Sequence, residues 1–144
     1  MGLMTLKHGR ISSLTEPFHG RAKDAHYLAY FDCFNRQLYF EAHEVLEVLW
    51  LRERGGVNGD YYKGLIQLAG AFVLLQKNRS APAAALFRLA EKNLRKYPAR
   101  HEQLSLETVL DLAESWRRRL ETPPGDTNLL ACHPAPRLEL ENGG

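Results

Sequence analysis

The residues of this sequence whose types and spacing could do chemistry are a histidine and a glutamate one helical turn apart. They lie in an apolar and aromatic run, LYFEAHEVLEVLWL, at residues 38–51. On a helix, His43, Glu47 and Trp50 fall within about 60° of one another. A carboxylate in apolar surroundings is costly unless it is paired. We therefore expect His43 and Glu47 to be bonded to each other, to other buried polar groups or to a metal ion.

The metal interpretation has a chemical basis, because side chains at i and i+4 can reach the same point. An imidazole with a carboxylate suits a divalent ion such as zinc or manganese. If His43 and Glu47 ligate the ion and Glu44 or a water acts as the base, the reaction would be metal-assisted hydrolysis. Two side chains are too few for a dedicated zinc site, which uses three or four. A buried structural hydrogen-bond network and a metal-free ligand pocket therefore stay open as alternatives.

The helix that follows offers a further polar side chain, Gln67, within a stripe of small residues. Gly64 and Gly70 on this stripe would let another helix approach closely, and a glutamine can donate and accept hydrogen bonds at once. We expect the two helices to cross there, with Gln67 near His43 and Glu47. The predicted ligand pocket comprises His43, Glu47, Gln67, Trp50, Tyr39 and Tyr62.

The elements that must position these residues are helices. Apolar spacing of three and four predicts helices over about 20–35, 38–53, 61–77, 80–97 and 105–121. No stretch has the alternation of a strand, so the fold class is an all-α, single-domain bundle of about five helices. Residues 1–19 are expected to form a flexible N-terminal arm. Residues 122–144 hold four of the seven prolines and are expected to form an extended or disordered tail.

Length and composition limit the class of protein. The chain has 144 residues, 44% hydrophobic and 25% charged, which fits one globular domain. No apolar run approaches the roughly 18 residues of a membrane span, and the N-terminus lacks a secretory signal, so we expect a cytoplasmic protein without membrane contact. Cys33 and Cys132 cannot form a disulfide framework. The net charge of +2 makes nucleic acid an unlikely partner.

Three blocks of sequence together resemble a known family. They are Phe34-Asn35, the run from Tyr39 to Trp50 with its His-x-x-x-Glu-x-x-Trp motif, and Gly64-Leu65-Ile66-Gln67-Leu68-Ala69. They resemble domain-of-unknown-function family 309, which consists of small, mostly prokaryotic, all-helical proteins. The resemblance covers roughly residues 24–98 and implies a metal-binding role for His43 and Glu47, with no established activity.

The sequence departs from the family pattern at two positions. Gln37 stands where members often have glycine, and Leu74 stands where many carry histidine on the face of Gln67. One plausible extra metal ligand is therefore missing.

Two functions from different classes follow from these features. One is a metal-binding hydrolase, in which a semi-buried polar site at His43, Glu47 and Gln67 takes an unidentified small molecule. The other is a non-catalytic interaction module, which forms a homo-oligomer or binds another protein and in which the same residues are structural. A concave pocket that reaches His43 favours the first function, and an exposed apolar helix face favours the second.

Overall fold

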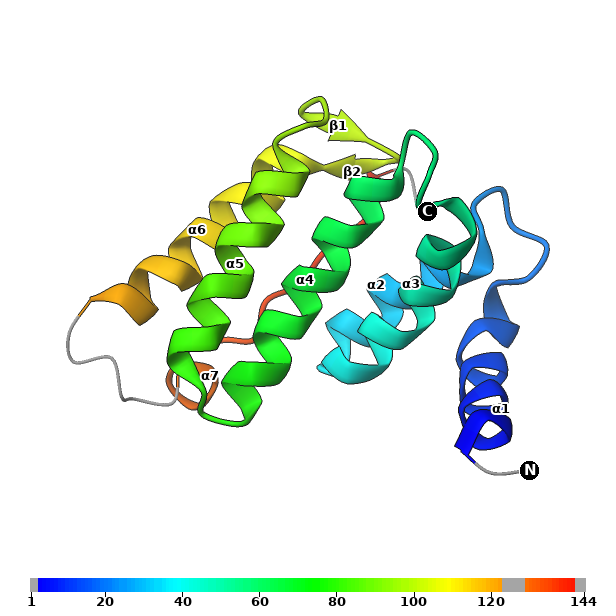
Figure 1. Cartoon of the computed structure of the whole chain (residues 1–144), viewed down its shortest axis with the longest axis horizontal. Coiled ribbons are helices and arrows are strands. Elements are labelled where there is room, and N and C mark those ends of the chain that lie inside the picture. Colours follow the sequence, from blue (N-terminus) through cyan, green and yellow to red (C-terminus); the bar gives the residue numbers. More distant parts are fainter. Residues whose placement is uncertain (1–2, 123–128, 142–144) are drawn as a thin grey trace.

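The computed structural model describes residues 3–122 and 129–141, and this part of the chain is an all-α bundle (Figure 1). Its elements are α1 (Leu3–Thr15), the 3-10 helix η1 (Glu16–Phe18), α2 (Ala25–Asn35), α3 (Tyr39–Glu53), α4 (Gly59–Gln76), α5 (Ser80–Leu94), β1 (Arg100–His101), β2 (Leu104–Ser105), α6 (Leu106–Glu121) and α7 (Leu129–Cys132). Helices α2 to α6 are the five predicted helices, so the predicted fold class is confirmed. Among the described residues, no helix has the length and apolar character that crossing a membrane requires.

Local sequence signals set several helix ends. The Asp24 side chain caps α2 by accepting a hydrogen bond from the backbone N–H of His26, and Ser105 caps α6 by accepting one from Thr108. After α2 the chain turns at Gln37, whose φ of 62° lies in the left-handed region. Glycine adopts this conformation without strain. Gln37 therefore occupies a turn position at which glycine would be less strained.

Helix α4 occupies the middle of one layer of the bundle, between α3 and α5 (Figure 1). Helix α2 packs on α3, and α6 packs on α5. Phe72 of α4 joins these helices, because its ring lies 5.1 to 5.5 Å from the rings of Phe34, Tyr39, Phe87 and Trp116. The core is therefore centred on one aromatic side chain that contacts α2, α3, α5 and α6.

The small-residue stripe of α4 faces α5. A Cβ atom on Gly64 would lie 2.8 Å from the side chain of Leu94, and one on Gly70 would lie 3.2 Å from Leu86. A larger residue at Gly64 would require Leu94 to shift, and one at Gly70 would be tightly packed against Leu86. The expectation that α3 would cross α4 at this stripe was wrong, because α5 fills the place that the small residues leave.

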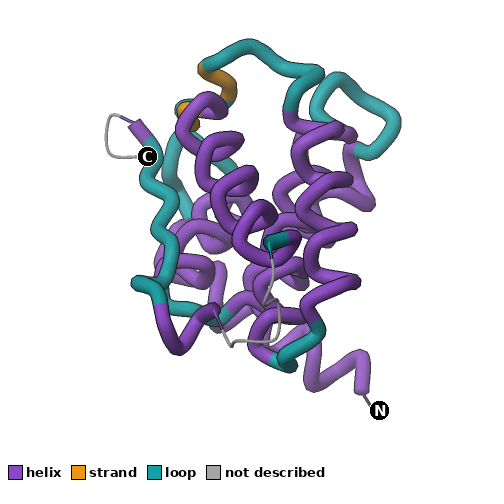
Figure 2. The backbone as a smooth tube through the Cα atoms, turned by 90° about the vertical axis from the view of Figure 1, so that its left-hand side faces the viewer, coloured by secondary structure: helices purple, strands orange, loops and turns teal. Residues whose placement is uncertain are grey.

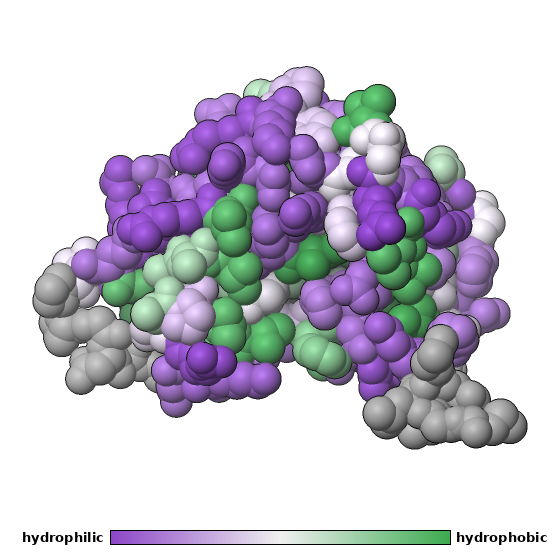
Figure 3. All heavy atoms as spheres, in the orientation of Figure 1, coloured by the Kyte–Doolittle hydropathy of each residue, from purple (hydrophilic) through white to green (hydrophobic). Residues whose placement is uncertain are grey.

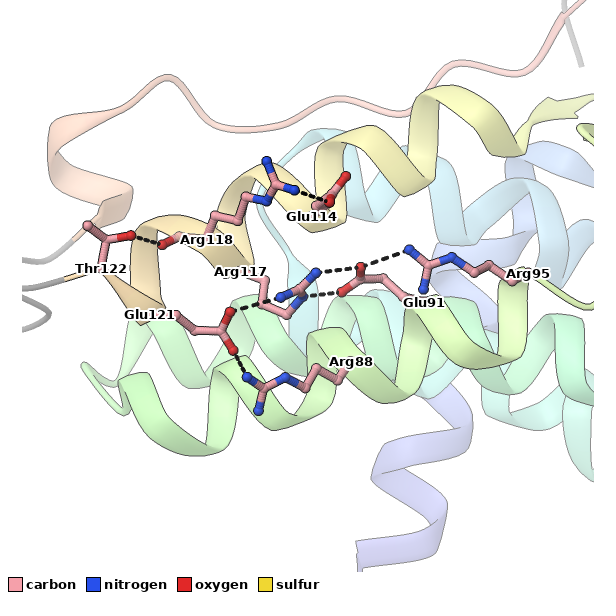
Figure 4. A network of polar contacts seen from close by, with 8 residues as sticks. All are labelled: Arg88, Glu91, Arg95, Glu114, Arg117, Arg118, Glu121 and Thr122. Atoms are coloured by element: carbon pink, nitrogen blue, oxygen red, sulfur yellow. Dashed lines mark hydrogen bonds and ion pairs between the residues drawn. The ribbon is translucent and has the colours of Figure 1, made fainter.

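A network of charged side chains joins α5 to α6 (Figure 4). Glu91 is only 1% exposed, and it accepts hydrogen bonds from Arg117 Nε at 2.7 Å and Arg117 Nη2 at 3.2 Å. Arg95 approaches Glu91 at 3.4 Å, and Glu121 pairs with both Arg117 and Arg88. We call these five residues the α5–α6 seam.

The N-terminal segment differs from its prediction. Residues 1–19 were expected to form a flexible arm, but Leu3–Thr15 forms α1, and Glu16–Phe18 forms η1. Ile11 and Thr15 of α1 are buried, and Arg10 forms an ion pair with Glu44 of α3. The apolar spacing of these residues does not predict a helix. Helix α1 instead packs against the bundle through Ile11, Thr15 and Arg10.

The chain after α5 also differs from its prediction. Strands β1 and β2 form a hairpin, whose turn residues Glu102 and Gln103 both have positive φ. Strands of two residues are too short for an alternating pattern to be visible in the sequence. In the predicted tail, Leu129–Cys132 forms one turn of helix, α7, and residues 134–140 have no regular secondary structure. Pro123 and Pro124 lie outside the described residues.

Candidate functional site

His43 and Glu47 lie together on α3, with Nε2 of the histidine 3.6 Å from Oε2 of the glutamate. Their side chains are 31% and 33% exposed, so this α3 pair is half-buried. Two apolar side chains on the same side of the helix are more exposed, Phe40 at 48% and Leu51 at 53%. The Phe40 ring lies 5.7 Å from the His43 ring. We call Phe40, His43, Glu47 and Leu51 the α3 outer face.

The space-filling view shows hydrophobic surface over α3 among hydrophilic side chains (Figure 3). The spacing of Phe40, His43, Glu47 and Leu51 at i, i+3, i+7 and i+11 places them on one stripe of the helix. Phe40 therefore lies on the solvent side of α3 and not in the core. The core side of α3 is formed by the buried residues Tyr39, Ala42, Val45, Leu46 and Leu49.

Helix α1 contributes two basic side chains that the sequence analysis did not connect with this region. Lys7 Nζ lies 3.5 Å from Glu47 Oε1. Arg10 Nη2 donates to both carboxylate oxygens of buried Glu44, at 2.6 and 2.7 Å. A guanidinium that donates to both oxygens of a buried carboxylate holds it in place by a charge-assisted pair. The geometry of Glu44 therefore fits a structural ion pair better than the predicted catalytic base.

Gln67 has a partner other than the predicted one. Its Oε1 accepts a hydrogen bond from Asn93 Nδ2 of α5 at 2.8 Å. This bond lies beside Gly64, whose Cβ position is 3.2 Å from Asn93 Cβ. Gln67 therefore belongs to the α4–α5 interface and does not bond to His43 or Glu47.

Tyr39 is fully buried in the aromatic core, where its ring stacks on that of Phe72 at 5.1 Å. Its hydroxyl has no hydrogen-bond partner among the described residues. Burial raises the pKa of Tyr39 to about 12, so the phenol stays neutral at ordinary pH. Tyr39 contributes to packing under α3 and not to its outer face.

The two other predicted pocket residues lie in different surroundings. Trp50 is half-buried, and the guanidinium of Arg54 lies 5.6 Å above its ring. Tyr62 is buried at the start of α4, with its ring 6.2 Å from that of Tyr27 and 5.6 Å from that of Tyr61. Burial raises the pKa of Tyr62 above its ordinary value. The structure thus brings His43 and Glu47 together and separates the pair from Gln67, Tyr39 and Tyr62.

The described residues around the α3 pair offer few further donors for a metal ion. Among residues 3–122 and 129–141, no group of three or more His, Cys, Asp or Glu side chains is placed to hold a metal ion. The α3 pair supplies two donors, fewer than a dedicated site uses. The four cavities described in this part of the chain, of about 170 to 400 Å³, are lined by other residues. The predicted pocket at His43 is not among these cavities.

Comparison with known proteins identifies the family. Residues 27–86 match the family described as Domain of unknown function (DUF309), which confirms the resemblance inferred from the sequence. The matched part runs from α2 into α5 and contains His43, Glu47 and Trp50. Searches of the curated proteins and of the solved structures found no match to this chain.

Proposed function

We propose that this chain, whose residues 27–86 form a DUF309 domain, is a non-catalytic interaction module that pairs with a second copy of itself through the α3 outer face. The observation that carries the proposal is the position of the α3 pair, which lies open between the exposed side chains of Phe40 and Leu51. Aromatic and aliphatic side chains around a central polar pair are common where two proteins meet.

The order of residues along α3 favours a second copy as the partner. In a two-fold symmetric, antiparallel pair of helices, residues equally far from the axis on either side contact each other. His43 and Glu47 lie two residues before and after position 45, and Phe40 and Leu51 lie five before and six after it. His43 of each copy would therefore face Glu47 of the other, and Phe40 would lie one residue, about 1.5 Å along the axis, from the level of Leu51. Every contact in this arrangement is either apolar or of opposite polarity.

The test is the oligomeric state of the full chain by sedimentation velocity at about 1 to 100 µM, a range that brackets the moderate affinities expected of a small interface. We expect the wild type to form dimers and Leu51→Glu to shift the chain to monomers. The matched control is Val57→Glu, which adds the same charge at an exposed residue outside α3 and should stay dimeric. A wild type that is monomeric throughout, or a Leu51→Glu variant that dimerises equally, would contradict the proposal.

A charge exchange tests the pairing itself. His43→Glu places a carboxylate opposite Glu47 of the second copy, so the dissociation constant should rise by at least about tenfold. Adding Glu47→His restores opposite polarity at each contact, and dimerisation should recover. Recovery distinguishes the antiparallel pairing from a general effect of charge on solubility, because the double variant has the same composition as the wild type. Dimers that survive His43→Glu unchanged would contradict this pairing.

A divalent metal at the α3 pair is the second candidate, favoured by the 3.6 Å approach of His43 Nε2 to Glu47 Oε2. One chain offers two donors, and two copies facing each other would offer four, the number that structural zinc uses. With an open coordination position, such an ion would also supply the activated water of the predicted hydrolysis. Sedimentation with a chelator, and with added zinc or manganese, separates the candidates. Dimers that persist in chelator support the metal-free interface, and dimers that need the ion support the metal.

A further inference from the structure

The C-terminal residues 134–141, which we call the strap, run extended along one side of the bundle (Figure 2). Pro136 and Leu138 of the strap are buried, and Arg137 and Glu139 are exposed. This alternation is that of an extended peptide, with every second side chain inserted into a surface. Leu138 is 2% exposed and belongs to the hydrophobic core cluster, which it joins from outside the helices.

Asn35, the last residue of α2, binds the strap through its backbone. Its Nδ2 donates to the carbonyl oxygen of Leu138 at 2.9 Å, and its Oδ1 accepts from the Leu138 N–H at 2.7 Å. A side-chain amide that makes both bonds to one residue recognises an extended backbone whatever its sequence, while the inserted side chain supplies specificity. Asn35 thus acts on the strap as a receptor residue acts on a peptide ligand.

The end of the strap is held at the β hairpin. The Glu141 N–H donates to the carbonyl oxygen of Gln103 at 2.7 Å, and the Glu141 carboxylate lies 3.2 Å from Arg100 Nη1. Two main-chain anchor points three residues apart, with a leucine inserted at the first, are enough to set the register of an extended segment. The ion pair favours an acidic residue at the second anchor.

The groove that holds the strap is larger than the strap that fills it. A cavity of about 400 Å³ remains between the strap, α2 and η1, bounded by Phe18, Phe31 and Leu140 among other residues. A second cavity, of about 170 Å³, lies between the strap and the start of α6. A peptide with a larger apolar side chain at the position of Leu140 would therefore have room to bind in the same register.

From these observations we propose that the groove between α2, η1 and the start of α6 is a peptide-binding site, and that the strap occupies it as an intramolecular ligand. The partner it fits is an extended segment of another protein with a leucine at the position of Leu138, a larger apolar residue two positions later and an acidic residue next. This site is separate from the α3 outer face. A partner must displace the strap, which competes at a high effective concentration because it belongs to the same chain.

The experiment uses the full chain and a fluorescein-labelled peptide of residues 134–141, PAPRLELE, followed by fluorescence anisotropy. Leu138→Asp should release the strap and leave the groove open to the peptide. We expect saturable binding to this variant and at least about tenfold weaker binding to the wild type, in which the strap competes. The control is Glu139→Ala, which changes an exposed residue of the strap and should bind the peptide as weakly as the wild type.

Two further arms define the site. Adding Asn35→Ala to Leu138→Asp should abolish binding, and an unlabelled peptide with aspartate in place of the leucine should not compete. A peptide with phenylalanine at the position of Leu140 should bind more tightly than PAPRLELE. Equal binding to the wild type and to Leu138→Asp would overturn the proposal, as would no binding to a Leu138→Asp chain with unchanged helicity. If Leu138→Asp and the milder Leu138→Ala both unfold the chain, the strap is part of the core and not a displaceable ligand, which also overturns it.

Discussion

The α5–α6 seam and the α3 pair both join carboxylates to basic side chains. They differ in burial and in hydrogen bonding. In the seam, Glu91 is almost fully buried and accepts two hydrogen bonds from Arg117 (Figure 4). In the α3 pair, His43 and Glu47 are each about one-third exposed and lie 3.6 Å apart. Water can solvate both members of the second pair and cannot reach Glu91.

This difference separates residues that hold the fold from residues that are free to bind. A half-exposed ion pair contributes little to stability, because water screens it and holding both side chains has an entropic cost. A buried pair is costly to break from one side, because the remaining charge is stranded. The α3 pair can therefore change partners at low cost in stability, as a contact between two copies requires, and the seam cannot.

Among the charged side chains, the largest effect is expected from Arg117→Met, which leaves Glu91 buried without its principal partner. Breaking a buried ion pair in this way costs about 3 kcal/mol of unfolding free energy. The measurement is chemical denaturation, and the control is Arg118→Met on the same helix, whose exposed ion pair with Glu114 should change stability by less than about 0.5 kcal/mol. A loss below about 1 kcal/mol for Arg117→Met would mean that Glu91 gains water or a new partner.

A smaller loss is expected from Arg10→Met, although Glu44 is buried as well. Helix α1 can move away from α3 and let water reach Glu44, so the loss is limited to the docking of α1, about 1 to 2 kcal/mol. Hydrogen exchange should show faster exchange in α1 with α4 and α5 unchanged. Global loss of protection would show that α1 is as integral to the bundle as the seam.

The seam and helix α1 also show how much of the fold the sequence could predict. The five helices from α2 to α6 followed from apolar spacing that repeats over three or more turns. Glu91 lies on such a stripe, between Phe87 and Leu94, but its burial depends on Arg117, which is 26 residues further along the chain. Helix α1 contains Gly9, Ser12 and Ser13, which form helices weakly, and it packs through contacts with distant residues.

The same limit applies to the candidate site: contacts between neighbours on one helix follow from the sequence, and contacts between different helices do not. The approach of His43 to Glu47 follows from their i, i+4 spacing, which is local. The partner of Gln67 depends on which neighbouring helix faces the small residues of α4, and periodicity does not specify that neighbour. An aromatic stripe also does not show which part of it another helix covers, so the sequence could not predict that Phe40 is exposed and Trp50 half-buried.

Trp50→Ala tests a residue close to the α3 pair whose burial is intermediate between that of the core and that of the α3 outer face. A fully buried tryptophan would cost about 3 to 5 kcal/mol on truncation to alanine. Trp50 is half-buried with Arg54 over its ring, so we expect about 1 to 2 kcal/mol in chemical denaturation. Trp116→Ala, in the core beside Phe72, is the matched comparison and should lose the full amount. Equal losses would place Trp50 with the core and not with the α3 outer face.

The smallest effect is expected at the α3 pair itself. In a double-mutant cycle with His43→Leu, Glu47→Met and their combination, the coupling energy should be below about 0.5 kcal/mol, as for other half-exposed pairs. The same cycle at the seam, with Glu91→Met and Arg117→Met, should give a coupling of more than about 1 kcal/mol, because removing both charges restores much of what either single change loses.

The cycle at the α3 pair is measured at a concentration at which the chain is monomeric, so that contacts between copies do not contribute. A coupling as large as that of the seam would mean that His43 and Glu47 hold the monomer together, which would remove the argument that they are free to bind. A small coupling in the monomer, together with weaker dimerisation of each single variant, would assign the energy of the pair to the interface. The energy of one pair would then contribute to the fold and that of the other to the contact between two copies, although both join a basic side chain and a carboxylate on helices.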